Sequence, residues 1–233
     1  VPFKEAQKRN PEVFPLIDGN RKFAHFWTNP CFTSPKSVEF LLESIETSFN
    51  NAPNQELGYV GIFQADNTGV CGCPNCMKPI KLKDGTLLKP KSPYSYKDNV
   101  FWSTRQFVFI NKVAEELVKK HPDVKIVTHA YIHSSEPPLV DIHPAIKPQY
   151  AAYSTKNIRY PLMAGKHNDQ GDLWERRFLG WLKLKKTGLG FFGYYYPDGF
   201  TAVADTFAED HRVLAKSKGF FACTESFDDI DEP

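Results

Sequence analysis

Short apolar runs alternate along this chain with longer segments in which apolar residues recur every three or four positions. The short runs predict strands and the periodic segments predict helices. Alternation of this kind is typical of a parallel sheet whose strands are joined by crossover helices. The predicted strands cover Tyr59 to Phe63, Val124 to Tyr131, Asn157 to Met163, Leu189 to Tyr196 and Gly219 to Thr224. The predicted helices cover Ser34 to Phe49, Asn99 to Lys120, Asp172 to Lys186 and Ala202 to Ser217.

The number of strands sets the expected architecture. A closed (β/α)8 barrel needs eight strands and about 250 residues. We therefore predict one α/β domain over residues 1–233, formed by the C-terminal five or so strand–helix units of a TIM-type barrel. An open doubly wound sheet is the alternative, but no dinucleotide-type glycine fingerprint follows any predicted strand. A polar insert at about 78–98, with Asp84-Gly85 between Leu82 and Leu87, predicts a loop or small hairpin.

Composition excludes two classes of partner. The formal net charge is only +2 and the basic residues are scattered, so no electrostatic argument favours nucleic acid. No apolar stretch approaches the roughly 20 residues that span a bilayer. The chain begins at Val1 rather than Met, which indicates a processed chain or a fragment. We therefore expect a missing N-terminal barrel part or an associated chain, and neither a nucleic-acid partner nor a membrane span.

Polar residues follow each predicted strand, where parallel α/β folds place their chemistry. Carboxylates among amides and aromatic rings suit glycoside cleavage, because one carboxylic acid protonates the leaving oxygen while a second group supports the oxocarbenium-like centre. The candidate catalytic residues are Asp66, Glu225 and Glu136. The candidate substrate-binding residues are Gln64, Asn67, His129, Tyr131, His167, Tyr194, Tyr196 and Asp198.

Several of these residues also have a purely structural interpretation. Asp66-Asn67 could cap the turn after the first strand. His129 lies within a strand, where a histidine is more often part of the core than a catalyst. Glu136 precedes Pro137-Pro138 and could belong to the loop surface.

Three of the five cysteines lie in the loop after the first predicted strand, as Cys71, Cys73 and Cys76. Their C-x-C-x2-C spacing lets thiolates converge on Zn²⁺, but a closed tetrahedral site needs a fourth ligand. In a barrel, Cys31 would lie on the neighbouring loop at the same face. We therefore predict a structural zinc site made of Cys31, Cys71, Cys73 and Cys76. A disulfide among these cysteines and a catalytic thiol are the alternatives.

Five segments resemble one known family in order and spacing. Asn10 to Arg21 resembles its H-P-E-(Y/W)-F-A-L-x-(D/N)-G-x-R motif, and Asn29 to Pro35 its L-C-L-T-N-P segment. Gln64 to Cys76 is similar to its Q-N-D…C-x-C-x2-C signature. Phe109 to Ile126 is similar to its F-x-N-x-V-A…P-D-x-K-I unit, and Thr128 to Pro138 to its T-L-A-Y…P-P segment. The family comprises bacterial (β/α)8-barrel proteins long catalogued as a domain of unknown function, and some members are endo-β-N-acetylglucosaminidases.

The resemblance implies a glycoside hydrolase that acts on a β-linked amino sugar or complex glycan, without a catalytic cofactor. It also implies a periplasmic, cell-surface or secreted location. Hexosaminidase-like relatives carry an Asp–Glu pair at this strand end, with Glu as the acid and Asp orienting the acetamido group. This chain has Asp66-Asn67 there, and Ala65 where the family has Asn. The resemblance therefore reaches Asp66, and Glu225 or Glu136 would be the second carboxylate.

Two other functions stay open. The first is a non-catalytic glycan-binding barrel that has kept its pocket and lost its acid. The second is a scaffold protein organised around zinc or thiols.

Overall fold

The computed structural model describes residues 7–21, 29–51, 58–65, 69–92, 98–152, 161–164, 173–184, 188–194, 204–216 and 222–225. For residues 194, 204 and 222–225 it describes the backbone alone. The chain has a mixed α/β fold built on a five-stranded parallel sheet. The strands are β3 (Tyr59–Gly61), β6 (Lys125–Ala130), β7 (Ile146–Ala151), β8 (Gly190–Tyr194) and β9 (Ala222–Glu225).

Strand order in this sheet follows the chain. The order is β3-β6-β7-β8-β9, and every neighbouring pair is parallel. A doubly wound sheet would reverse direction at a switch point. No reversal occurs among the described strands, so each new strand is added at the same edge, as in a barrel.

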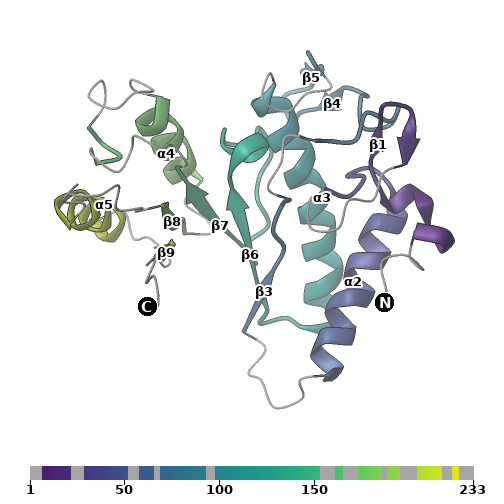
Figure 1. The fold of residues 1–233 in the computed structure, drawn as a ribbon, viewed down its shortest axis with the longest axis horizontal. Coiled ribbons are helices and arrows are strands. Elements are labelled where there is room, and N and C mark those ends of the chain that lie inside the picture. Colours follow the sequence, from purple (N-terminus) through teal and green to yellow (C-terminus); the bar gives the residue numbers. More distant parts are fainter. Residues whose placement is uncertain are drawn as a thin grey trace, which may run out of the picture.

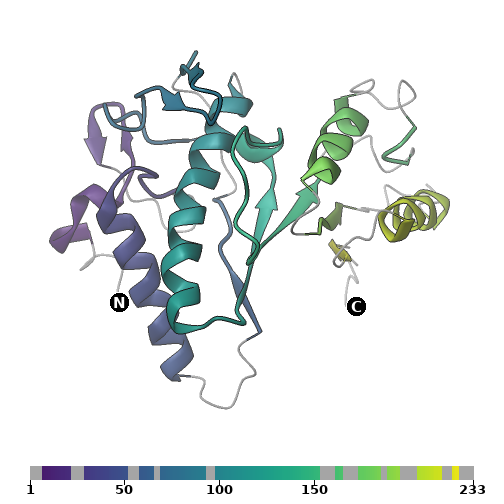
Figure 2. The same ribbon diagram turned by 180° about the vertical axis from the view of Figure 1, so that it is seen from behind.

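The larger helices pack on one face of the sheet. They are α2 (Pro35–Asn51), α3 (Asn99–Lys120), α4 (Leu173–Lys183) and α5 (Ala204–Lys216). Figures 1 and 2 show α2 and α3 beside β3 and β6, and α4 and α5 beside the later strands. On this helix-covered face, the Tyr150 ring of β7 lies 5.8 Å from Phe178 of α4. Likewise, Phe191 of β8 lies 6.4 Å from His211 of α5.

The ladder registers place a different set of residues on the opposite face. Gly61 pairs with Val127, His129 with Gln149, and Ala151 with Phe192. Paired residues of parallel strands point to the same side, and alternate residues point to opposite sides. The side chains of Val127, His129, Gln149 and Phe192 therefore line the face away from the helices. We call it the opposite face.

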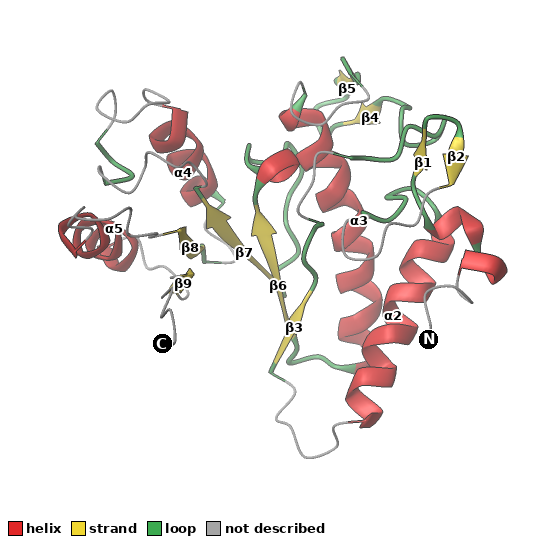
Figure 3. Ribbon diagram, in the orientation of Figure 1, coloured by secondary structure: helices red, strands yellow, loops and turns green. Residues whose placement is uncertain are grey.

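The sequence explains why α2 and α3 form where predicted. Proline at the first position of α2 has the fixed φ that helix starts favour, and Ile45 is buried on its inner side. Helix α3 occupies Asn99–Lys120 as predicted, and it ends before His121-Pro122 because the residue before a proline avoids helical backbone angles. Figure 3 shows α3 running along the sheet next to α2.

One predicted strand is wrong. The third strand was expected at Asn157 to Met163, but β7 is Ile146–Ala151, and residues 161–164 form a turn. Residues 153–160 lie outside the described part. The proline at position 148 hides β7 in the sequence, because proline lacks the N–H that a central strand normally donates. The structure accommodates it because β8 pairs only from Gln149 onward.

The small hairpin predicted near Asp84-Gly85 is present. Strands β4 (Ile80–Lys81) and β5 (Leu87–Leu88) pair in antiparallel fashion, and Gly85 has a φ of +85° that suits the turn. A second small hairpin, β1 (Leu16–Ile17) with β2 (Asn20–Arg21), turns through Asp18-Gly19 near the N-terminus. Among the described helices, none is long and apolar enough to cross a membrane.

The closed barrel is not confirmed. Among the described strands, β3 and β9 are the two edges of the sheet and no ladder joins them. The described residues form a mixed α/β fold in which the carboxyl ends of all the parallel strands lie at the same edge of the sheet.

Candidate functional site

His129 lies between two aromatic rings on the opposite face. Its imidazole is 4.4 Å from the Phe63 ring and 5.0 Å from the Phe192 ring, between centroids. Burial lowers the pKa of His129 to about 4, and a hydrogen bond with the Gln149 side chain offsets this only in part. The imidazole is therefore neutral at pH 7, and it suits hydrogen bonding better than binding of an anion.

The carboxyl end of β3 is tied to the end of β6 through Gln64. Its amide nitrogen donates to the carbonyl oxygen of Tyr131, and its amide oxygen accepts a 2.6 Å hydrogen bond from the Ser134 hydroxyl. Ser134 belongs to the short 3-10 helix η4 (Ile132–Ser134) that follows β6. Both predicted binding residues here, Gln64 and Tyr131, thus lie together at neighbouring strand ends. Both ends of the Gln64 amide therefore hold the backbone after β3 against the segment that follows β6.

A buried amide holds the residues on either side of Asp66. The Asn29 side chain is 1 % exposed. Its oxygen accepts a 3.0 Å hydrogen bond from the Ala65 N–H, and its nitrogen donates a 3.0 Å hydrogen bond to the Gly69 carbonyl. The backbone that leads into Asp66 and the backbone that leaves Thr68 are therefore fixed relative to each other.

Several predicted site residues fall outside the described part of the chain or are described only by their backbone. Tyr194 and Glu225 are opposite each other in the β8–β9 ladder, which places both positions at the carboxyl edge of the sheet. The residues outside the described part are Asp66, Asn67, His167, Tyr196 and Asp198.

Glu136 is held by arginines of α4. Its carboxylate accepts a 2.8 Å hydrogen bond from Arg177 Nε and is 3.3 Å from two nitrogens of Arg176. Next to it, the Trp181 indole N–H donates to the Ser135 carbonyl at 2.9 Å. The arrangement favours an anchoring role for Glu136, linking the loop after β6 to α4.

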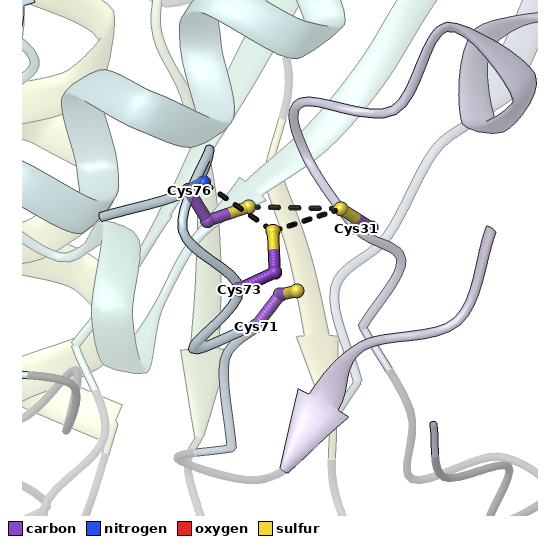
Figure 4. Close-up of side chains that lie close together, drawn as sticks. All are labelled: Cys31, Cys71, Cys73 and Cys76. Carbon is purple, nitrogen blue, oxygen red and sulfur yellow. Dashed lines mark hydrogen bonds between the residues drawn. The ribbon is translucent and has the colours of Figure 1, made fainter. Parts of the chain in front are cut away.

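The four predicted metal-binding cysteines come together. Their sulfurs all lie within 4.8 Å of one another, and all four side chains are buried. Cys31 Sγ is 3.7 Å from Cys73 Sγ and 3.7 Å from Cys76 Sγ. Figure 4 shows Cys31 facing the loop that carries the other three. Sulfurs bound to zinc at ~2.3 Å on a tetrahedron lie ~3.8 Å apart, whereas a disulfide needs about 2.05 Å. The four cysteines are free thiols in a geometry that can hold a metal ion.

Local backbone geometry presents the sulfurs. The Met77 N–H donates to the Cys73 carbonyl at 3.1 Å, which closes the turn that follows Cys73. The Cys76 N–H lies 3.4 Å from Cys73 Sγ, and the Leu16 N–H lies 3.2 Å from Cys71 Sγ. Backbone N–H groups that donate to sulfur are the outer contacts that orient ligands and stabilise thiolates.

Positive charge also surrounds the sulfurs. Arg21 donates to the Phe14 carbonyl at 2.6 Å and lies 3.8 Å from Cys71 Sγ. Arg105 is almost fully buried and interacts electrostatically with Cys76 and Cys73. Both guanidinium groups favour negative charge on the sulfurs, Arg21 through its contact with Cys71 and buried Arg105 through its electrostatic interaction with Cys73 and Cys76.

Contacts among Cys31, Cys71 and Cys76 favour ionisation of one of these three thiols over the other two. Hydrogen bonds from Cys71 and Cys76 hold the pKa of Cys31 far below its usual range. The hydrogen bond with Cys31 raises the pKa of Cys71 to about 12, and hydrogen bonds with Cys31 and Cys71 raise the pKa of Cys76. Adjacent thiolates repel one another without a cation, whereas a divalent cation lets coordinating thiols lose their protons. The donor set therefore fits a metal ion.

A family model described as a domain of unknown function, DUF4838, matches residues 1–221. The chain belongs to the DUF4838 family. This confirms the domain-of-unknown-function part of the resemblance. No curated protein and no solved structure matches the chain.

Three residues that shape the site in this DUF4838 domain were not among the predicted site residues. Asn29 and Arg21 matter because of what they contact across the fold, and Gln149 lies in the strand that was missed. Only Asn29 carried a readable signal, because Asn-Pro directly before a cysteine that could hold a metal ion marks a fixed turn. The other two depend on pairings between distant segments.

A second buried histidine makes the stability of the domain pH-dependent. His133 is 0 % exposed, and neither ring nitrogen has a hydrogen-bond partner among the described residues. Burial lowers its pKa to about 3. With His129 at about 4, both folded-state pKa values lie below the unfolded value of about 6.5. The stability they confer is complete above about pH 6.5 and is lost as the pH falls toward 4, because the unfolded chain then binds protons that the folded chain does not.

We expect the free energy of unfolding to fall by about 2 kcal/mol per histidine between pH 7 and pH 5. Urea titrations at pH 7, 6 and 5 measure it. The variant His133→Leu removes one of the two groups and should halve the slope. An unchanged slope in this variant would contradict the assignment.

Proposed function

We propose that this DUF4838 domain is a glycoside hydrolase that cleaves a β-linked amino sugar or a related glycan, with Asp66 at the cleavage centre. One observation carries the proposal: the end of β3 is fixed on both sides of Asp66 at the carboxyl edge of a parallel sheet. Asn29 bonds Ala65 and Gly69, and Gln64 is tied to the end of β6. Fixed backbone at a strand end is what a catalytic carboxylate requires.

We also propose that the sheet is part of a closed (β/α)8 barrel. Strand order that follows the chain, with helices on one face, supports this architecture. Tyr59, the first residue of the edge strand β3, is 61 % exposed, and Phe63, just after β3, is 55 % exposed. A closed barrel would bury them among interior side chains. The remaining strands would come from an N-terminal barrel part or an associated chain.

The proposed roles follow from the chemistry of glycoside cleavage. Asp66 would donate a proton to the glycosidic oxygen, and Glu225 or the acetamido group of the substrate would support the positive charge at the anomeric carbon. Asn67, Tyr194 and Tyr196 would hold sugar hydroxyls, near neutral His129. A carboxyl separation of about 5–5.5 Å between Asp66 and Glu225 would indicate a retaining reaction, and about 6.5–9.5 Å an inverting one.

For the cysteine cluster we propose a structural zinc ion bound by Cys31, Cys71, Cys73 and Cys76. Four thiolates close the coordination sphere, so such an ion holds the loops together and does not activate water. The sulfur spacings and the surrounding N–H and guanidinium donors support this assignment.

A glycan panel tests the hydrolase proposal. We expect the full-length protein to release sugar from a glycan or an aryl glycoside with a β-linked N-acetylhexosamine. Calorimetry on the same panel distinguishes the rival functions. Binding without release would favour a glycan-binding barrel. Absence of both binding and release, with metal retained, would favour a zinc scaffold.

A further inference from the structure

We propose that Asn29 couples the cysteine cluster to the carboxyl end of β3. Its buried amide uses both of its ends, accepting from the Ala65 N–H and donating to the Gly69 carbonyl, each at 3.0 Å. The Asn29 side chain therefore joins the backbones of Ala65 and Gly69 to the distant segment that carries Asn29. Asn29 is therefore a positioning residue, and it acts on backbone atoms.

The cluster sets the position of Asn29. Only Pro30 separates Asn29 from Cys31, and proline fixes its own φ, so little freedom remains between the amide and the sulfur. The Cys31 N–H also donates to the Val13 carbonyl at 2.8 Å. Displacing Cys31 must therefore displace Asn29.

The other side of the link is equally short. Only Val70, which is 5 % exposed, separates Gly69 from Cys71. The path from Cys31 through Asn29 and Gly69 to Cys71 closes into a ring when one metal ion binds both sulfurs. Ordering at the metal therefore reaches Gly69 directly along the chain. Among the described residues, it reaches Ala65 through the amide of Asn29.

A consequence follows for chemistry, and this part rests on the proposed function. Asp66 follows Ala65 directly in the chain, so an ordered Ala65 backbone limits where the Asp66 carboxyl group can lie. Small displacements of a catalytic group lower turnover much more than they lower substrate binding.

Hydrogen exchange of the Ala65 amide, measured by NMR, tests the coupling. Asn29→Ala should raise this exchange rate about tenfold, the effect expected when one hydrogen bond is lost. Removing metal from the wild type with a chelator should raise it similarly. In Asn29→Ala, the chelator should have no further effect on Ala65, because the link is already cut.

A matched control is available in helix α3. The Asn111 amide bridges the Asp141 carbonyl at 2.7 Å and the His143 N–H at 2.9 Å, remote in sequence from every cysteine. Asn111→Ala should leave the Ala65 exchange rate and its response to chelator as in the wild type. Asn29→Asp keeps the oxygen that accepts from the Ala65 N–H, but it replaces the donor to the Gly69 carbonyl with a second oxygen that is repelled by that carbonyl. This conservative variant should restore protection at Ala65 only in part.

The coupling is overturned if chelation raises Ala65 exchange equally in wild type and Asn29→Ala, or if neither change affects it. Should Asn29→Ala fail to fold, Asn29→Asp decides the same question. Turnover is a separate readout: kcat should fall about tenfold in Asn29→Ala with KM nearly unchanged. If no glycan is cleaved, the hydrolase proposal fails while the exchange measurements still decide the coupling.

Discussion

Replacing Cys73 with serine should abolish stoichiometric zinc binding and lower the free energy of unfolding by more than about 4 kcal/mol. Cys73 Sγ lies within the buried set of four sulfurs and accepts from the Cys76 N–H at 3.4 Å. A serine hydroxyl at this position is a poor zinc ligand, so the three remaining cysteines leave the tetrahedral site one thiolate short. Elemental analysis of the purified protein and urea denaturation measure the two effects.

The comparison needs two controls. Cys223→Ser removes the fifth cysteine, which lies in β9 and is not one of the four clustered cysteines, so zinc content and stability should stay near wild type. Metal-stripped wild type should match Cys73→Ser, and a chelator should not destabilise that variant further. Absence of zinc from the wild type would overturn the zinc assignment, and a disulfide test on the same sample would then be informative.

Replacing Asp66 with asparagine or alanine should lower turnover by about two to four orders of magnitude, the range that general acid catalysis contributes. The loss should be greatest for substrates with poor leaving groups, because an aryl leaving group departs without protonation. The pH–rate profile should also lose the limb that reports ionisation of the acid. Rates on sugar and aryl leaving groups, measured on one protein preparation, give both tests.

Asp84→Asn is the matched control for Asp66. Asp84 lies in the exposed turn between β4 and β5, where its carboxylate accepts from the Thr86 N–H at 2.9 Å. We expect unchanged turnover there. If Asp66→Asn keeps wild-type turnover on all substrates, Asp66 is not the acid, and Glu225 becomes the carboxylate to replace.

The helices could be predicted because local signals agreed with one another. The apolar residues of α2 and α3 recur at helical spacing, with Pro35 at the start of α2 and Pro122 just beyond α3. Both helices lie where predicted. Strand β7 could not be predicted, because Pro148 argues locally against a strand and only the ladder to β6 and the late start of β8 explain it. The parallel strand order of the sheet was predictable, whereas barrel closure stays a prediction, because no ladder joins β3 to β9 among the described strands.

The candidate site divides in the same way. The cysteine loop was readable from its spacing, and Cys31 could be added because neighbouring loops of a barrel meet at one face. The arginine contacts of Glu136 were not readable, since α4 is distant in sequence and both charges look solvated in isolation. For His129, the pattern left core and binding roles open. The structure places a neutral imidazole between two rings on the opposite face, and the binding role of His129 stays a prediction.

The location of the cysteine cluster in the chain has a consequence for biosynthesis. All four clustered cysteines, and the hairpin Leu16 to Arg21 that contacts Cys71, lie within the first 76 residues. Strand β6, the partner of β3, begins only at Lys125. A ribosome therefore exposes the complete thiol set long before any strand of the main sheet has a neighbour. Under the zinc proposal, metal supply during translation should then govern how much chain reaches the native state, and the metal-bound loop should be an early ordered region of the nascent protein.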